Sequence, residues 1–125
     1  MGLILDTSIL VDIERKDKKT LEVLRELRER FPSTLKISFM TLFEFLYGLR
    51  YKSQQNRVKY ELMLENFEVI HTTSKTAKFL ALLKEKYELP LADLFIASQV
   101  MESGGILITK DQDFNDISEI DKIII

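Results

Sequence analysis

The sequence predicts an α/β fold, in which a central parallel sheet of about four to five strands carries helices on both faces. Three observations lead to this fold class. The 125 residues suit a single domain, predicted over residues 1–125. Hydrophobic residues make up 46% of the chain and charged residues 30%, which is typical of a globular protein. Short apolar runs alternate with longer segments of helical spacing, as in strand–helix–strand units.

The first half of the chain opens with an apolar run that ends at Asp6, Thr7 and Ser8, a combination that favours a turn and a helix cap. Further on, apolar residues at positions 21, 24, 27 and 31 repeat with helical spacing until Pro32 ends the pattern. We therefore expect strands at residues 2–5 and 35–39, and helices at 8–14, around 21–31 and at 41–51.

The second half continues the alternation. Pro90 favours the start of a helix, and the glycine pair Gly104–Gly105 favours its end. The expected elements are helices at 54–66, at 74–87 and from 90 to the glycine pair, and strands at 67–71, 106–109 and 122–125. The apolar residues expected to face the core from the helix at 54–66 are Val58, Leu62 and either Phe67 or Met63.

The residue inventory excludes several classes of active site. The absence of cysteine excludes disulfides, thiolate nucleophiles and cysteine-based zinc sites. The single histidine, His71, cannot build a histidine-rich metal cage, and we expect it to be structural or exposed. No apolar stretch is long enough to span a membrane and the N-terminus lacks a signal-peptide pattern, so a cytoplasmic protein without a membrane partner is expected. Catalysis would have to rest on carboxylates, hydroxyls or lysines.

Four acidic residues occupy unusual positions. Asp6 and Asp111 each follow an apolar strand, whereas Glu44 and Asp93 lie inside apolar segments, in the expected first turns of helices. Acidic side chains are rarely buried unless they are paired, hydrogen-bonded or bound to a metal. Each also has a structural explanation: Asp6 can cap a helix, Thr41 and Glu44 match a capping box, Asp93 suits a helix dipole and Asp111 suits a turn.

Both interpretations place the four carboxylates at the same edge of the sheet. In open α/β sheets, ligands bind outside the carboxyl ends of the strands, where helix N-termini also point. Carboxylates gathered there repel one another, and a divalent cation removes that cost. Oxygen donors without histidine or cysteine select hard ions. The sequence therefore predicts one or two Mg²⁺ or Mn²⁺ ions, and the phosphate-ester chemistry that such ions support.

The chain resembles PIN-domain ribonucleases, and more closely the VapC-like toxins of type II toxin–antitoxin pairs. The residues that carry the resemblance are Leu-Asp-Thr-Ser-Ile-Leu at 5–10, Thr-Leu-Phe-Glu-Phe-Leu-Tyr-Gly at 41–48, Leu-Ala-Asp-Leu-Phe-Ile-Ala-Ser at 91–98 and Leu-Ile-Thr-Lys-Asp-Gln-Asp-Phe at 107–114. Each string alone is weak evidence. Together, in this order, they span essentially the whole chain.

The resemblance implies a metal-dependent endoribonuclease that cleaves RNA phosphodiester bonds with metal-activated water. Its catalytic and metal-binding residues would be Asp6, Glu44, Asp93 and Asp111. Ser8 and Thr109 would orient these carboxylates, and Asp113 is a further candidate that would either reach a second ion or only cap a turn. The resemblance also implies a homodimer and a cognate antitoxin. The alternative is a catalytically silent PIN scaffold that binds RNA or a protein partner.

A basic segment at residues 50–60 suggests where RNA would lie. It contains no acidic residue, and three tyrosines are interleaved with or flank its basic side chains. Such a pattern suits single-stranded RNA or exposed loops of structured RNA, although a solvated helix face explains it equally well. The candidate RNA-binding residues are Arg50, Lys52, Arg57, Lys59 and Tyr51.

The formal net charge of −2 at first argues against a nucleic-acid partner. Without the four singled-out carboxylates, however, 16 acidic residues face 18 basic ones. The slight acidity is therefore better interpreted as the mark of a metal site than as a property of the whole surface.

Overall fold

Five parallel strands form one sheet in the order β3-β2-β1-β4-β5 in the computed structural model, which describes residues 2–125. The strands are β1 (Leu3–Leu5), β2 (Leu35–Ser38), β3 (Glu68–Ile70), β4 (Ile106–Thr109) and β5 (Asp121–Ile124). All four neighbouring pairs are parallel, so the predicted parallel α/β sheet is confirmed.

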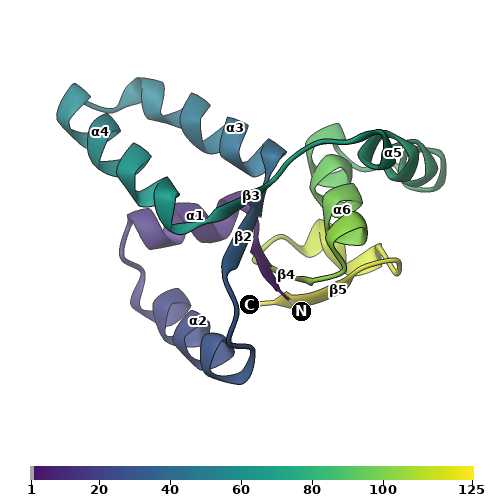
Figure 1. Cartoon of the computed structure of the whole chain (residues 1–125), viewed down its shortest axis with the longest axis horizontal. Coiled ribbons are helices and arrows are strands. Elements are labelled where there is room, and N and C mark those ends of the chain that lie inside the picture. The colour runs from purple at the N-terminus through teal and green to yellow at the C-terminus, as the bar shows by residue number, and fades with distance from the viewer. Residues whose placement is uncertain (1) are drawn as a thin grey trace.

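The connections between the strands are helical. The α-helices are α1 (Thr7–Glu14), α2 (Lys18–Arg30), α3 (Phe39–Gly48), α4 (Gln54–Met63), α5 (Ser74–Lys86) and α6 (Leu91–Ser103). Three short 3₁₀ helices complete the fold: η1 (Leu49–Tyr51), η2 (Leu64–Asn66) and η3 (Gln112–Asp116). In Figure 1 the sheet separates α1 to α4 on one side from α5 and α6 on the other, and the two termini lie close together.

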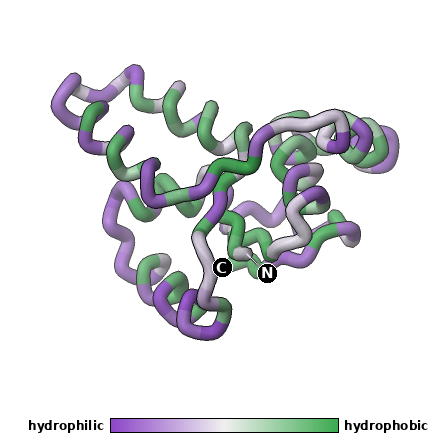
Figure 2. The backbone as a smooth tube through the Cα atoms, in the orientation of Figure 1, coloured by the Kyte–Doolittle hydropathy of each residue, from purple (hydrophilic) through white to green (hydrophobic). Residues whose placement is uncertain are grey.

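The strands bury both of their faces, as the apolar runs predict. Side chains alternate across β1: Leu3 and Leu5 join the core on the α1–α4 side, whereas Ile4 joins the core beneath α5 and α6. Likewise Ile108 and Leu107 of β4 face opposite cores. Figure 2 shows hydrophobic segments along the sheet and along most of α3, with hydrophilic residues on parts of the other helices. No helix within residues 2–125 is both long and apolar enough to cross a lipid bilayer.

Helix α3 begins earlier than the sequence suggests, and this overturns the predicted capping box. Ser38, the last residue of β2, is the N-cap, and its hydroxyl accepts from the Thr41 amide at 3.2 Å. Thr41 is therefore already inside the helix, and Glu44 lies in its second turn rather than its first. Ser38 is the N-cap instead of Thr41 because serine is a favoured N-cap residue and lies at the end of β2, three residues before Thr41.

Helix α4 turns a different face to the core from the one predicted. Val58 is 53% exposed and Leu62 is 58% exposed, so both assignments were wrong. Met63, the predicted alternative, packs against the core together with Tyr60 and Phe67. No side chain of α4 itself is fully buried, so the weak apolar pattern left the orientation of this helix open.

The strand order places a topological switch point between β1 and β4. From the central strand β1, the chain first adds β2 and β3 on one side and later adds β4 and β5 on the other. The order thus reverses between β1 and β4, whose carboxyl ends lie next to each other, with Leu5 paired to Ile108. Ligands of open α/β sheets bind at such a switch point.

A glycine pair, Gly104 and Gly105, joins α6 to the amino end of β4. Gly104 adopts a left-handed conformation with φ 73°, which ends the helix at the predicted place. Gly105 is buried, and a Cβ atom there would lie 2.5 Å from the carbonyl oxygen of Gly2. The backbone at Gly105, directly before β4, therefore approaches the backbone at Gly2, directly before β1, too closely for a Cβ atom to fit.

Replacing Gly105 with alanine is expected to destabilise the fold by about 1–3 kcal/mol, because backbone atoms must move to admit the methyl group. Gly48→Ala is the matched control, since Gly48 has helical angles and no atom within 4 Å of the new Cβ. That substitution should raise the free energy of unfolding by about 0.5–1 kcal/mol. Urea denaturation measures both values, and equal effects would contradict the close approach.

Candidate metal centre at the switch point

Asp6 lies at the switch point, directly after β1, and is 4% exposed. It is the N-cap of α1, and its Oδ1 accepts from the Ile9 amide at 3.2 Å and from the Ser8 hydroxyl at 2.6 Å. Its Oδ2 accepts from the Thr109 hydroxyl at the end of β4. The two residues that the sequence singled out as partners of the carboxylates thus both donate to Asp6, and the predicted helix cap is confirmed.

Burial raises the pKa of Asp6 above its ordinary value, and the nearby charge of Asp111 adds to the effect. Hydrogen bonds from Ser8, Thr109 and the Ile9 amide act in the opposite direction, since they stabilise the charged form. The site therefore holds a carboxylate whose burial is only partly offset by its donors.

Three further carboxylates meet beside this residue. One oxygen each from Asp93, Asp111 and Asp113 lie within 4.8 Å of one another. Asp93 projects from the first turn of α6, and Asp111 caps η3, where its Oδ1 accepts from the Asp113 amide at 2.9 Å. Among residues 2–125, no other group of three or more His, Cys, Asp and Glu side chains has metal-binding spacing.

Asp93 experiences the charge of all the other candidate residues. Burial together with Asp111, Asp113, Glu44 and Asp6 raises the pKa of Asp93 to about 6, with burial the largest cause. The sequence predicted four carboxylates at one edge of the sheet. The structure brings Asp93 and Asp111 together with Asp113, while Asp6 and Glu44 lie outside the group of three but close enough to act on Asp93.

Glu44 reaches the site from α3 and is tied to α1. Its Oε1 accepts from the Thr7 hydroxyl at 2.6 Å, and Thr7 also contacts the Thr41 hydroxyl at 3.4 Å. Sequence reasoning did not find Thr7 as a partner of Glu44, because 37 residues separate the two and no local pattern links them. The first turn of α1 thus hydrogen-bonds two acidic residues. Ser8 donates to Asp6, the N-cap of the same helix, and Thr7 donates to Glu44 of α3.

The donor set suits a hard divalent cation. Every candidate ligand is a carboxylate, and three of these carboxylates come within 4.8 Å of one another. None of the three forms an ion pair with a basic side chain of residues 2–125. Mg²⁺ and Mn²⁺ prefer oxygen ligands of this kind. A cation here would offset the mutual repulsion that is reflected in the pKa of Asp93.

Comparison with known families identifies the fold around this centre. The model of the PIN domain family matches residues 3–120. The chain belongs to the PIN domain family. A comparison with curated proteins returned no match.

Solved structures with the same fold include chains of toxin–antitoxin complexes. VapBC2 from Rickettsia felis, bound to a DNA fragment from its promoter, is similar at a TM-score of 0.84 and 24% identity, over 100% of this PIN domain and 99% of that chain. A toxin–antitoxin complex from Klebsiella pneumoniae gives a TM-score of 0.78 and 26% identity, over 94% of both chains. VapBC-1 from nontypeable Haemophilus influenzae gives 0.81 and 20%, over 99% of this chain and 98% of that chain.

The predicted RNA-binding residues of this PIN domain are all exposed. Arg50 and Tyr51 lie in η1, Lys52 follows η1, and Arg57 and Lys59 lie in α4. The Arg50 guanidinium lies 3.5 Å from the centroid of the Tyr47 ring and 4.0 Å from that of Tyr51. Tyr51 is 79% exposed, so one face of this aromatic stack is free for a planar group. Lys52 is engaged elsewhere, because it forms an ion pair with Glu14 at 3.0 Å.

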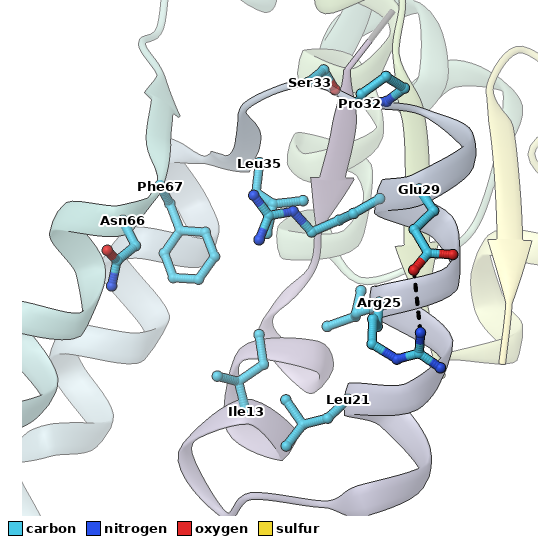
Figure 3. A pocket seen from close by; sticks show the side chains of 11 residues that line it. Ile13, Leu21, Arg25, Glu29, Pro32, Ser33, Leu35, Asn66 and Phe67 are labelled. Atoms are coloured by element: carbon cyan, nitrogen blue, oxygen red, sulfur yellow. Dashed lines mark hydrogen bonds and ion pairs between the residues drawn. The ribbon is translucent and has the colours of Figure 1, made fainter.

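A cavity of the PIN domain lies away from the carboxylates. It measures about 790 Å³ and is lined by residues of α1 and α2, by the segment leading into β2, and by Asn66 and Phe67. Figure 3 shows the apolar side chains around it and the Arg25–Glu29 hydrogen bond at its rim. None of the five candidate acidic residues lines this cavity, so it is separate from the candidate metal centre.

Replacing Asp93 with asparagine is expected to stabilise the metal-free protein at pH 7. The pKa of Asp93 is about 6 in the folded protein against an ordinary value of 3.8. Between these values the folded state binds more protons than the unfolded state, so wild-type stability falls as pH rises through this window. In EDTA, the melting temperature of Asp93→Asn should exceed that of the wild type most at pH 7 and least near pH 4.

The charge-matched control is Asp121→Asn, at the amino end of β5 and therefore at the opposite edge of the sheet. It should shift the melting temperature by a similar small amount at both pH values. A stabilisation by Asp93→Asn that is larger at pH 4 than at pH 7 would contradict the assigned repulsion.

Proposed function

We propose that this PIN domain is a metal-dependent endoribonuclease and the toxin of a toxin–antitoxin pair. One observation carries the proposal: the oxygens of Asp93, Asp111 and Asp113 lie within 4.8 Å of one another beside buried Asp6, at the switch point of a parallel sheet. Structural similarity to chains of VapBC complexes supports the toxin role.

The metal-binding residues in this proposal are Asp6, Glu44, Asp93, Asp111 and Asp113. They would hold one or two Mg²⁺ or Mn²⁺ ions. A divalent cation in such a site lowers the pKa of water and neutralises charge on a phosphoryl group. The ions would be held by oxygen donors alone, which agrees with a chain that has no cysteine and whose single histidine is exposed.

The remaining polar residues keep these carboxylates in place. Ser8, Thr109 and the Ile9 amide fix the Asp6 carboxylate, and Thr7 fixes that of Glu44. Donors of this kind orient ligands and prevent the carboxylates from turning away from one another. Because they are supplied by α1 and β4, the arrangement is set before an ion or substrate arrives.

RNA is proposed to run from the metal centre along α3 towards α4. Arg50, Arg57 and Lys59 would contact phosphates, and the exposed ring of Tyr51 would stack on a base. Lys52 would contact a phosphate only while its ammonium group is also paired with the Glu14 carboxylate. Single-stranded RNA, or exposed loops of structured RNA, offers both the phosphates and the unstacked bases.

An antitoxin and a second copy of this chain are the proposed protein partners. The support for the antitoxin is the similarity to chains of VapBC and other toxin–antitoxin complexes. The support for a homodimer is the apolar surface of α3. Large exposed apolar patches mark partner-binding surfaces. The exposed apolar side chains of α3 are Phe39, Phe43, Leu46 and Tyr47.

The wild-type chain is expected to cleave single-stranded RNA with Mn²⁺, and EDTA should abolish cleavage. Asp6→Asn should reduce the rate about 100-fold or more, because it removes the buried charge at the centre of the site. Asp121→Asn, at the opposite edge, should cleave like the wild type. Gel analysis of a labelled RNA measures all four reactions.

Two outcomes would contradict the proposed activity. Equal cleavage by the wild type and Asp6→Asn would assign the activity to a contaminant. Binding of RNA without cleavage by any variant would favour a catalytically silent PIN scaffold.

A double substitution, Arg57→Ala with Lys59→Ala, is expected to raise the KM for single-stranded RNA about three- to ten-fold and to leave kcat nearly unchanged. Fewer phosphates would be neutralised, so the salt dependence of binding should also become shallower. Lys75→Ala with Lys78→Ala, two exposed lysines of α5 across the sheet, is the control. An equal effect of both pairs would contradict a specific RNA path along α4.

A further inference from the structure

Asp12 is a buried carboxylate outside the candidate metal centre. It lies in α1 and is 8% exposed. Its Oδ2 accepts from the Thr20 hydroxyl of α2 at 2.6 Å and from the Lys110 ammonium at 2.9 Å. These hydrogen bonds lower the pKa of Asp12, that of Thr20 being the largest cause, so Asp12 is charged at neutral pH.

Lys110 occupies the position between two residues of the site. Thr109 donates to Asp6 on one side of it, and Asp111 belongs to the three clustered carboxylates on the other. Its own side chain nevertheless reaches α1 and pairs with Asp12, 98 residues away in sequence. The basic residue next to the acidic cluster is thus paired with an acid that is not part of it.

The backbone of this segment does not depend on that ion pair. The Lys110 amide donates to the Ser8 hydroxyl at 3.3 Å, and the Asp111 amide donates to the Thr109 hydroxyl at 2.9 Å. The carbonyl of Thr109 accepts from the Ile125 amide at 2.9 Å. These contacts hold the backbone of residues 109–111 to α1 and to Ile125 without using the Lys110 side chain.

We propose that Asp12 is a positioning residue that holds the Lys110 ammonium away from Asp93, Asp111 and Asp113, and so leaves these carboxylates available to a divalent cation. This inference rests on the proposed metal site. A lysine ammonium is a compact charge on a flexible stem, with three donors that suit carboxylates. Besides Asp12, the acidic residues around Lys110 are Asp17, whose charge also acts on it, and Asp111, the next residue in the chain and a member of the cluster. An ammonium paired with the cluster competes with the cation for the same oxygens.

Isothermal titration of the full chain with MnCl₂ tests this role through a double-mutant cycle. Asp12→Asn keeps the size of the side chain and an acceptor for Thr20, but releases Lys110. It is expected to weaken Mn²⁺ binding roughly five- to ten-fold. Adding Lys110→Met should restore the wild-type affinity, because the competing charge is gone. Lys110→Met alone should change the affinity by less than about two-fold.

The rescue separates this role from a merely structural one. If Asp12 only supported the fold, the double variant would bind Mn²⁺ as weakly as Asp12→Asn, and this result would overturn the proposal. Unchanged affinity of Asp12→Asn would overturn it as well. Melting temperatures of all variants are measured so that each titration is made on folded protein.

A metal-free crystal structure of Asp12→Asn gives a second, independent readout. The Lys110 ammonium is expected within 4 Å of a carboxylate oxygen of Asp93, Asp111 or Asp113. An ammonium that still contacts residue 12 or points into solvent would overturn the inference. Failure of the wild type to bind Mn²⁺ would instead overturn the proposed metal site, while this crystal structure still decides where Lys110 lies.

Discussion

The rest of the site depends on the burial of one charged group, the carboxylate of Asp6. Removing a carboxylate from water is costly unless donors replace the lost water. Here the donors come from the first turn of α1 and from the end of β4, so satisfying Asp6 also ties these elements to β1. A charge that would destabilise an arbitrary core therefore helps to determine how the central strands and the first helix meet.

The hydrogen bonds to Asp6 do not remove the electrostatic repulsion among the neighbouring carboxylates. Burial and four nearby acids raise the pKa of Asp93, which means that the folded, metal-free protein contains repulsion that the unfolded chain lacks. Natural proteins commonly sacrifice stability in this way where activity needs a strained site. The proposed cation would neutralise this excess of negative charge. The ion pair of Asp12 with Lys110 would keep the lysine from neutralising it, so that the carboxylates stay available to the cation.

Much of the fold and of the site follows from local sequence patterns. Short apolar runs predicted the strands, because a strand buried on both faces needs no polar alternation. Asp6 and Asp111 could be placed at one edge, since parallel strands end on the same side. The predictions failed where several local solutions compete. Ser38 displaced Thr41 as the cap of α3, and Tyr60 and Met63 rather than Val58 and Leu62 face the core from α4.

The sequence by itself determined the strand–helix alternation, the acidic residues at strand and helix ends and the all-oxygen character of the site. These features depend on residues close together in the chain. Only the tertiary structure decided that Asp113 joins Asp93 and Asp111, that Thr7 holds Glu44 and that Lys110 turns to Asp12. Thr7 with Glu44 and Lys110 with Asp12 are pairs separated by 37 and 98 residues, and Asp93 lies on a different helix from the segment that carries Asp111 and Asp113. Side chains so far apart in sequence meet only when the sheet order and the packing of α1 and α3 bring them together, and no local pattern encodes that geometry.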